Sequence, residues 1–271
     1  MKNIRNVRRS AAVLALFVFS IVAVSCGGDG FRRSPSVDAM AAAEDVAHWS
    51  YEGSTGPDFW GSLDPSFVTC ADGSAQTPIN IVSPTPTDLP DIQFAYQSGQ
   101  AEIENNGHTI QANALEGSSI TVNGKTYELL QAHFHAPSEH TVNGKSYPAE
   151  VHFVHRADDG TLAVIGVLLE VGGADNHAWS PYVNGLPTKE GATTKQQFDW
   201  LAMLPTNHQT IRYNGSLTTP PCSEGVSWLL MSTPVSISEW QLKDFQEAYN
   251  GNNRPIEPLN GRTVQIDSTT K

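Results

Sequence analysis

Asn-Gly pairs recur along this chain and constrain its fold more than any other feature. Both residues tolerate the left-handed backbone conformation that tight hairpin turns need, so Asn-Gly between β-branched runs indicates two antiparallel strands. Seven such pairs occur, at 106–107, 123–124, 143–144, 184–185, 214–215, 250–251 and 260–261. We therefore expect a mainly β fold in which several of these pairs are hairpin turns.

One domain accounts for most of the chain. Between Val46 and Ile266 we find no linker, composition break or long charge run, and residues 267–271 are expected to be a frayed C-terminus. The segments Thr121–Tyr127 and Thr141–Tyr147 are nearly identical in sequence. No further copy follows at that period, so we interpret them as one turn chemistry used twice and not as a repeat protein.

Helical signals are few. Ser238 is a good N-cap for a helix over 239–249, and a short helix is expected over 196–203. The formal net charge of −12 disfavours nucleic acid and anionic membranes as partners, because both are negatively charged.

The first 26 residues have the pattern of an export signal. A basic start precedes an apolar run over 11–24, which is too short to span a bilayer comfortably. Small residues then lead to Cys26 in a context that resembles a bacterial lipobox, although Ala23 stands where that motif usually has Leu. We expect a periplasmic or cell-surface protein anchored to the membrane by a lipidated Cys26, with residues 27–45 as a flexible tether. Simple cleavage and a retained single-pass anchor are the alternatives.

Two cysteines remain once Cys26 is assigned to lipid. An even pair in an exported chain favours a disulfide between Cys70 and Cys222. Two buried thiols are the alternative, because sequence spacing does not show whether the two Cα atoms lie within bridging distance.

Three histidines on two expected strands are candidates for a metal site. His133 and His135 are two residues apart, so an extended strand points both side chains to one face. If Asn143-Gly144 is the turn of a continuous two-residue hairpin, His152 lies directly opposite His135 on the same face. The Pro137 segment can break this ladder with a bulge or loop.

Three histidines without a fourth protein ligand are typical of catalytic zinc, which keeps one position for water. Neutral imidazoles in an exported protein also favour zinc over thiolate-seeking metals. The alternative for each residue is an ordinary buried or exposed histidine. We adopt that alternative for His140, His155, His177 and His208.

The order of the motifs along the chain resembles that of the alpha carbonic anhydrases, in particular the exported bacterial members. The resemblance covers nearly the whole domain. Its motifs are His48–Gly53, Trp60-Gly61, Gln76–Asn80, Asn105–His108, Gln131–His135, Ser138–Thr141, Glu150–His155, Ser216–Pro221 and Asn253–Pro258.

This resemblance implies a fold and an activity. The family has a single domain built around a large twisted, mostly antiparallel central sheet with a few short helices, and its site lies in a cone-shaped cleft. The implied reaction is the reversible hydration of carbon dioxide to bicarbonate and a proton by zinc-bound hydroxide, with one Zn²⁺ held by His133, His135 and His152. Esterase side activity is expected as well.

The resemblance also assigns roles to single residues. Thr218 accepts a hydrogen bond from the hydroxide and donates its own proton to Glu139, and His108 is the proton shuttle. The residues expected around the ligands and the substrate are Gln131 beside His133, Glu150 beside His152, an apolar pocket of Val154, Val164, Leu217 and Trp228, and Thr219 on its polar side.

Two other function classes remain open. One is a binding or adhesion module that has the same fold without catalysis, a state that usually accompanies loss of the zinc ligands. The other is a zinc hydrolase that acts on esters. The sequence also leaves open whether two copies of the chain form a homodimer.

Overall fold

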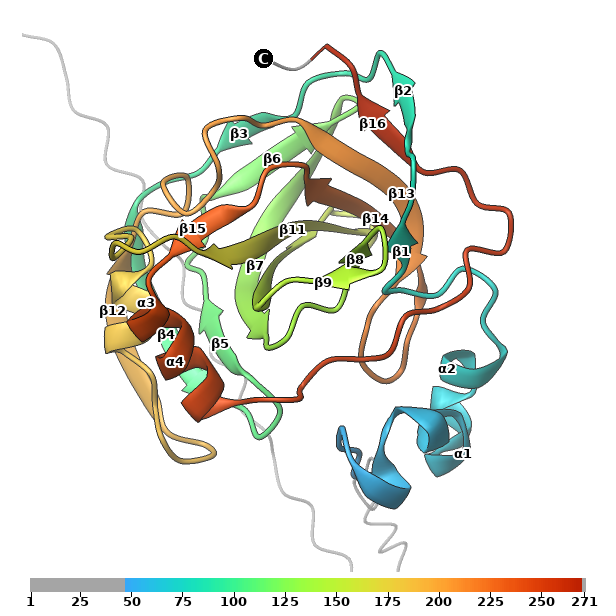
Figure 1. Ribbon diagram of the computed structural model, residues 1–271, viewed down its shortest axis with the longest axis horizontal. Coiled ribbons are helices and arrows are strands. Elements are labelled where there is room, and N and C mark those ends of the chain that lie inside the picture. The colour runs from blue at the N-terminus through green and yellow to red at the C-terminus, as the bar shows by residue number, and fades with distance from the viewer. Residues whose placement is uncertain (1–46, 270–271) are drawn as a thin grey trace, which may run out of the picture. The chain divides into compact units, whose positions relative to one another are not determined.

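A computed structural model describes residues 47–269 of the chain (Figure 1). The expected export signal, the lipidation site Cys26 and the whole of the tether lie outside the described residues. Within the described part, no helix has the length and apolar character needed to cross a bilayer.

Strands outnumber helices in the described part of the chain. The helices are the 3-10 helices η1 (Gly53–Thr55), η2 (Pro57–Phe59) and η3 (Pro65–Phe67), and the α-helices α1 (Trp60–Leu63), α2 (Thr69–Asp72), α3 (Ser180–Asn184) and α4 (Glu239–Ala248). The strands are β1 (Asn80–Ile81), β2 (Thr85–Thr87), β3 (Gln93–Ala95), β4 (Gly99–Asn105), β5 (Ile110–Asn113), β6 (Ser119–Val122), β7 (Lys125–His135), β8 (Thr141–Val142), β9 (Lys145–Ser146), β10 (Ala149–Arg156), β11 (Leu162–Val171), β12 (Thr193–Phe198), β13 (Thr210–Ser216), β14 (Glu224–Met231), β15 (Val235–Ile237) and β16 (Gln265–Asp267).

Thirteen strands form one large sheet, in the main order β12-β4-β5-β7-β10-β11-β14-β13-β16-β2. Most neighbours are antiparallel, whereas β11 is parallel to β14 and β15, and β16 is parallel to β2. Figure 1 shows α3 and α4 beside β12 and β4, with α1 and α2 at the far side of the sheet. The expected large, mostly antiparallel sheet with few short helices is confirmed.

Two of the Asn-Gly pairs are the tight hairpin turns that the sequence predicts. Asn123-Gly124 joins β6 to β7, and Asn143-Gly144 joins β8 to β9. The pair at 214–215 is not a turn, because it lies inside β13 and pairs with β14. Close packing explains why this strand position is a glycine. A Cβ on Gly215 would come within 2.1 Å of the Thr77 hydroxyl oxygen.

The helix predictions have two outcomes. Ser238 caps α4 through a complete capping box with Gln241, as its sequence indicates. The helix predicted over 196–203 is wrong, because residues 193–198 form β12 and pair with β4 along the sheet edge. Phe198 ends that strand in the core and stacks on Trp200, with ring centroids 4.5 Å apart.

The expected frayed end is wrong for residues 267–269. Asp267 is fully buried in β16, where its carboxylate lies 3.4 Å from the Arg212 guanidinium. The Ser268 N–H donates to the Thr87 carbonyl at 2.9 Å. These contacts keep the last described residues on the sheet.

Along β10, the two faces of the sheet pack against different hydrophobic clusters. Val151 and Phe153 point into the main hydrophobic core, whereas Val154 packs in a second apolar cluster with Trp228. Because successive strand side chains alternate between faces, His152 lies on the face of the second cluster. This alternation positions the candidate site.

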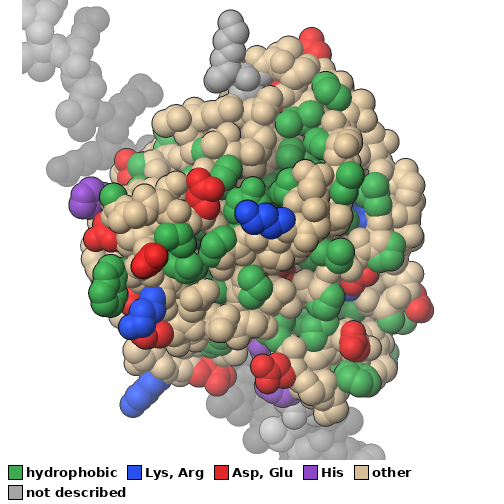
Figure 2. Space-filling model, in the orientation of Figure 1, with side chains coloured by type: hydrophobic (Ala, Val, Ile, Leu, Met, Phe, Trp, Pro, Cys, Tyr) green, Lys and Arg blue, Asp and Glu red, His purple; other side chains and the backbone are tan. Residues whose placement is uncertain are grey.

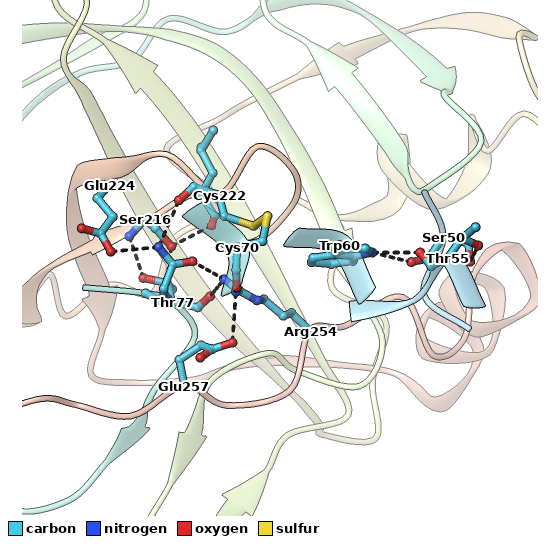
Figure 3. Close-up of a disulfide and its surroundings, with 12 residues drawn as sticks. Ser50, Thr55, Trp60, Cys70, Thr77, Ser216, Cys222, Glu224, Arg254 and Glu257 are labelled. Atoms are coloured by element: carbon cyan, nitrogen blue, oxygen red, sulfur yellow. Dashed lines mark hydrogen bonds and ion pairs between the residues drawn. A yellow bond between two sulfur atoms is a disulfide. The ribbon is translucent and has the colours of Figure 1, made fainter. Parts of the chain in front are cut away.

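A disulfide joins Cys70 of α2 to Cys222, in the loop between β13 and β14 (Figure 3). The expected pairing is confirmed, with the two Cα atoms 5.0 Å apart. The bridge spans 152 residues, so its loop-closure entropy corresponds to about 5 kcal/mol of stability. Arg254 braces the same region, because it donates to the Cys70 carbonyl at 2.9 Å and pairs with Glu257.

Charged side chains are scattered on one face of the described part. Figure 2 shows one face of the molecule, on which the basic side chains stand apart among acidic ones.

His155 makes stability depend on pH. Its ring is fully buried, with Nε2 2.7 Å from the Tyr96 hydroxyl, and burial lowers the pKa of His155 from 6.5 to about 3. Between those pH values the unfolded chain binds one more proton than the folded chain, so the free energy of unfolding decreases as the pH falls.

We expect His155→Gln to remove this dependence, because glutamine does not titrate. Urea unfolding between pH 6.5 and 5, at fixed zinc concentration, should show the native protein losing about 1 kcal/mol per pH unit more than the variant, because the unfolded histidine is half protonated at the upper pH and nearly fully protonated at the lower. Parallel stability curves for the two proteins would contradict the assignment.

Candidate metal centre

The three candidate ligands lie on neighbouring strands, with His133 and His135 on β7 and His152 on β10. The predicted register is wrong, because His152 lies opposite His133 and the partner of His135 is Glu150. The two segments that connect the β7–β10 ladder to the β8–β9 hairpin differ in length. Five residues (136–140) lie between β7 and β8, whereas three (147–149) lie between β9 and the first residue of β10 that pairs with β7. The ladder is therefore shifted by two residues, which leaves every side chain on its predicted face.

Each of the three imidazoles uses one ring nitrogen for a hydrogen bond and leaves the other without a hydrogen-bond acceptor. The bonds join His133 Nδ1 to Gln131 Oε1 at 2.8 Å, His135 Nδ1 to the Asn252 carbonyl at 2.6 Å, and His152 Nε2 to Glu150 Oε1 at 2.9 Å. All three partners are acceptor oxygens, so each bonded nitrogen carries the proton. The other nitrogen of each ring is then a lone-pair donor, the form that binds a metal.

These three lone-pair nitrogens converge. The ligand atoms of His133, His135 and His152 lie within 4.8 Å of one another, and His135 Nε2 is buried without a hydrogen-bond partner. Burial lowers the pKa of His133 and of His135, and the neighbouring imidazoles lower that of His133 further. Neutral lone pairs that face each other in a buried space fit a cation, and a donor set of three imidazoles suits zinc.

Glu139 lies beside these nitrogens with one oxygen unused. Its Oε1 accepts a hydrogen bond from the Arg254 backbone N–H at 2.8 Å. Its Oε2 is buried without a hydrogen-bond partner, 3.5 Å from His135 Nε2 and 3.9 Å from His152 Nδ1. Thr218 is also buried, but among the described residues it makes no hydrogen bond with Glu139.

Glu150 is the centre of a buried hydrogen-bond network. Oε1 bonds His140 Nδ1 at 2.7 Å as well as His152, and Oε2 accepts the N–H groups of Glu139 and His140. Burial alone would raise the pKa of Glu150, but the two histidines and their hydrogen bonds hold it well below its ordinary value. The carboxylate therefore stays anionic and fixes the orientation of His152.

His140 is a buried structural histidine, as expected for a position outside the ligand set. Its Nε2 bonds the Tyr213 hydroxyl at 2.6 Å, and that hydroxyl donates to Thr77 Oγ1 at 3.3 Å. His140, Glu150 and His152 could in principle form a second metal cluster. The ligand atoms of this group are already hydrogen-bonded to one another, since Glu150 Oε1 bonds both His140 Nδ1 and His152 Nε2. We therefore assign His140 and Glu150 to holding the His152 ring in place.

The expected apolar pocket residues gather on the ligand face. Val154, Val164 and Trp228 belong to one buried cluster, and Leu217 packs against it. The Trp228 ring lies with its centroid 4.8 Å from that of His152. Thr219 is half-buried, two residues further along the chain than Leu217.

His108 lies in the connection between β4 and β5 and is half-buried. Its ring stacks on Trp49 with centroids 3.7 Å apart, and His48 lies 6.4 Å away. Burial lowers the pKa of His108, His48 lowers it further and Glu190 raises it. The ring therefore lies among several titratable groups and not alone.

Two residues near the ligands were not found from the sequence. The Asn252 backbone carbonyl accepts a hydrogen bond from His135 Nδ1. The Asn252 side-chain amide donates hydrogen bonds to the carbonyls of Phe134 and His108. No local pattern marks Asn252, because it lies 117 residues from His135.

Gly166 is the second of these residues, and it had a usable signal. It lies opposite His152 in β11, where a Cβ would come within 2.6 Å of Leu230 Cδ1 and 3.2 Å of Glu150 Oε1. A glycine inside an apolar strand often marks such a close approach.

A large sheet that carries three converging imidazoles defines a β protein with a candidate metal site, and comparison with known proteins gives its family. The family model for eukaryotic-type carbonic anhydrase matches residues 55–268. Carbonic anhydrases of Pectobacterium carotovorum and Neisseria gonorrhoeae are each 42% identical, over 84% and 83% of this chain and 95% and 90% of their own.

A solved structure agrees with these relatives. The alpha-carbonic anhydrase of Thermovibrio ammonificans, in complex with the inhibitor sulfanilamide, has a TM-score of 0.79 and 43% identity. The match covers 81% of this chain and 99% of that one. The chain belongs to the alpha, or eukaryotic-type, carbonic anhydrase family and is an enzyme of this kind.

Proposed function

We propose that this enzyme hydrates carbon dioxide reversibly with one zinc ion held by His133, His135 and His152. One observation carries the proposal: three imidazoles, two buried and one half-buried, aim unprotonated nitrogens at one point, while each opposite nitrogen is hydrogen-bonded to an acceptor. Zinc in such a site supplies Lewis acidity that brings the pKa of a coordinated water near neutrality, as is known for this family.

The residues around the site would bind and orient the reactants. Carbon dioxide has no net dipole, so the apolar side chains of Val154, Val164, Leu217 and Trp228 suit it. Thr219 is proposed to line the polar side, where bicarbonate rests before release.

Thr218 and Glu139 are proposed to orient the nucleophile. A hydroxyl has one proton, so a Thr218 that donates to the unused Glu139 Oε2 can only accept a hydrogen bond from the attacking oxygen. That arrangement points an oxygen lone pair at the substrate. The orphaned, buried Oε2 supports this assignment.

His108 is proposed to carry the product proton to solvent. Histidine is the side chain whose ordinary pKa lies nearest that of the acidic water, so proton transfer between them is nearly balanced. Half-burial leaves part of the His108 ring open to solvent, and stacking on Trp49 orients it.

We expect His108→Ala to lower kcat in dilute buffer by about 10-fold or more, because positioned proton transfer contributes at least that much. The kcat/KM for carbon dioxide should change little, since the shuttle acts after substrate has reacted. Stopped-flow hydration with and without imidazole checks this, and imidazole should restore the rate. Full kcat in dilute buffer, or failure of imidazole to rescue, would remove His108 from the mechanism.

Two other activities are separated by one pair of assays. A non-catalytic binding module would bind zinc without hydrating carbon dioxide, and a dedicated ester hydrolase would turn over esters faster than carbon dioxide. Apolar side chains around the ligands favour carbon dioxide, with ester cleavage as a side activity.

We propose that the enzyme is exported and anchored by a lipid on Cys26. The N-terminal sequence pattern and the disulfide, which forms in oxidising compartments, support export. Intact-mass analysis of the native protein tests the lipid, and the unmodified mass of a chain cleaved before or after Cys26 would refute it.

A further inference from the structure

Two hairpin turns of this chain are nearly identical in sequence and in conformation. Thr121–Tyr127 and Thr141–Tyr147 differ at one position, Thr126 against Ser146. In both turns the Asn has a φ of 51° and the following Gly a φ of 77°, and both pairs are exposed. The two turns are therefore a matched pair within one protein.

The two turns differ in what holds the glycine N–H. Gly144 donates to Asn80 Oδ1 at 2.8 Å, and the Asn143 N–H donates to the Ile81 carbonyl at 2.9 Å. Asn80 also accepts from the Thr141 hydroxyl at 2.8 Å, which fixes its side chain. Among the residues that the structure describes, Gly124 N–H and the Asn123 side chain have no hydrogen-bond partner.

This difference bears on a reaction to which Asn-Gly pairs are prone. The glycine backbone nitrogen loses its proton and attacks the asparagine Cγ, a new C–N bond forms and ammonia leaves, which gives a cyclic imide. Water then opens the ring to aspartate or isoaspartate. No oxidant or reductant is needed, and glycine offers no Cβ to obstruct the attack.

We propose that Asn123 is the site at which this protein deamidates, and that Asn80 protects the otherwise equivalent Asn143. A glycine N–H that donates a hydrogen bond must break that bond before its nitrogen can attack. The bond to Asn80 therefore slows the reaction in one turn, and nothing equivalent slows it in the other.

The remaining Asn-Gly pairs are also restrained. The Gly107, Gly185 and Gly251 N–H groups donate to Asn105 Oδ1, the Tyr182 carbonyl and the Ala136 carbonyl, Gly215 lies in the β13–β14 ladder, and the Asn260 side chain donates to the Ser74 carbonyl. Among the described residues, Asn123 is the member of the set whose side chain and following N–H are both unrestrained.

Modification at this turn changes a charged neighbourhood. Asn123 lines a cavity of about 460 Å³ together with Arg212 and Arg262. Deamidation places a carboxylate there, and isoaspartate adds a backbone carbon two residues before β7 begins. The modified protein should therefore separate from the native form by ion exchange.

The test is ageing of the folded full chain at mildly alkaline pH in ¹⁸O-water, followed by peptide mapping. The Asn123 peptide should gain label about fivefold faster than the Asn143 peptide, the ratio that corresponds to about 1 kcal/mol for one hydrogen bond. In the urea-unfolded chain the two peptides should react at the same rate, because their local sequences match.

Two substitutions at Asn80 isolate the cause. Asn80→Ala removes the acceptor and should raise the Asn143 rate to that of Asn123, whereas Asn80→Asp keeps an acceptor oxygen and should keep the protection. Equal rates in the folded native chain, or an Asn143 rate unchanged by Asn80→Ala, would overturn the proposal. The ratio in the native protein decides the matter even where a variant folds poorly.

Discussion

Replacement of His152 by alanine is expected to abolish stoichiometric zinc binding and nearly all carbon dioxide hydration. His152 Nδ1 is one of the three converging donors, and His152 is the only one of them contributed by β10. Residues that only orient a ligand change metal affinity by about 10–100-fold, so loss of a ligand itself should exceed that range. Metal analysis after dialysis and a stopped-flow hydration assay measure the two effects.

His177→Ala is the matched control for this experiment. His177 is exposed and lies outside every candidate metal cluster of the described residues, so zinc content and activity should remain at the native level. His135→Ala should behave like His152→Ala, because its free nitrogen faces the same point. A His152→Ala protein that keeps one zinc per chain would show that the metal lies elsewhere.

Replacement of Thr218 by alanine is expected to separate metal binding from turnover. Thr218 is not among the three nitrogen donors, so zinc content should remain stoichiometric. Loss of the hydroxyl leaves the nucleophile without its orienting partner, and misplacement of a reacting group costs about 100-fold in rate. The kcat/KM for carbon dioxide should therefore fall by about that factor.

Thr218→Ser provides the control, because serine keeps the hydroxyl that donates to Glu139. It should retain most of the activity. Glu139→Gln should lose activity as Thr218→Ala does, because the side-chain oxygen is used by the Arg254 N–H and an amide nitrogen in place of Oε2 cannot accept the hydrogen bond from the Thr218 hydroxyl. Unchanged turnover in Thr218→Ala would exclude the proposed orientation of the nucleophile.

Much of the site could be predicted from alternation along strands. His133, His135 and His152 share a face because the strand period is two, and the slip between β7 and β10 is also two residues. The hairpins at Asn123 and Asn143 follow from the turn chemistry of Asn-Gly alone. These inferences depend on local geometry, which the local sequence determines.

What could not be predicted depends on distant parts of the chain. The predicted register of His152 was wrong because segments 136–140 and 147–149 differ in length. Nothing in the local sequence shows how many residues on each side leave the ladder. Residues 196–203 were expected to be helical, but pairing with β4 makes 193–198 a strand. Tertiary contacts decide such segments, as they decide the contact between Asn252 and His135.

Zinc titration of metal-free protein, followed by carbon dioxide hydration and ester hydrolysis in parallel, tests the central claim most directly. The account predicts that chelator-stripped protein is inactive and that hydration rises with added zinc to a plateau at one equivalent per chain, well ahead of ester cleavage. Hydration that survives complete removal of zinc, or stays absent with one zinc bound per chain, would contradict it.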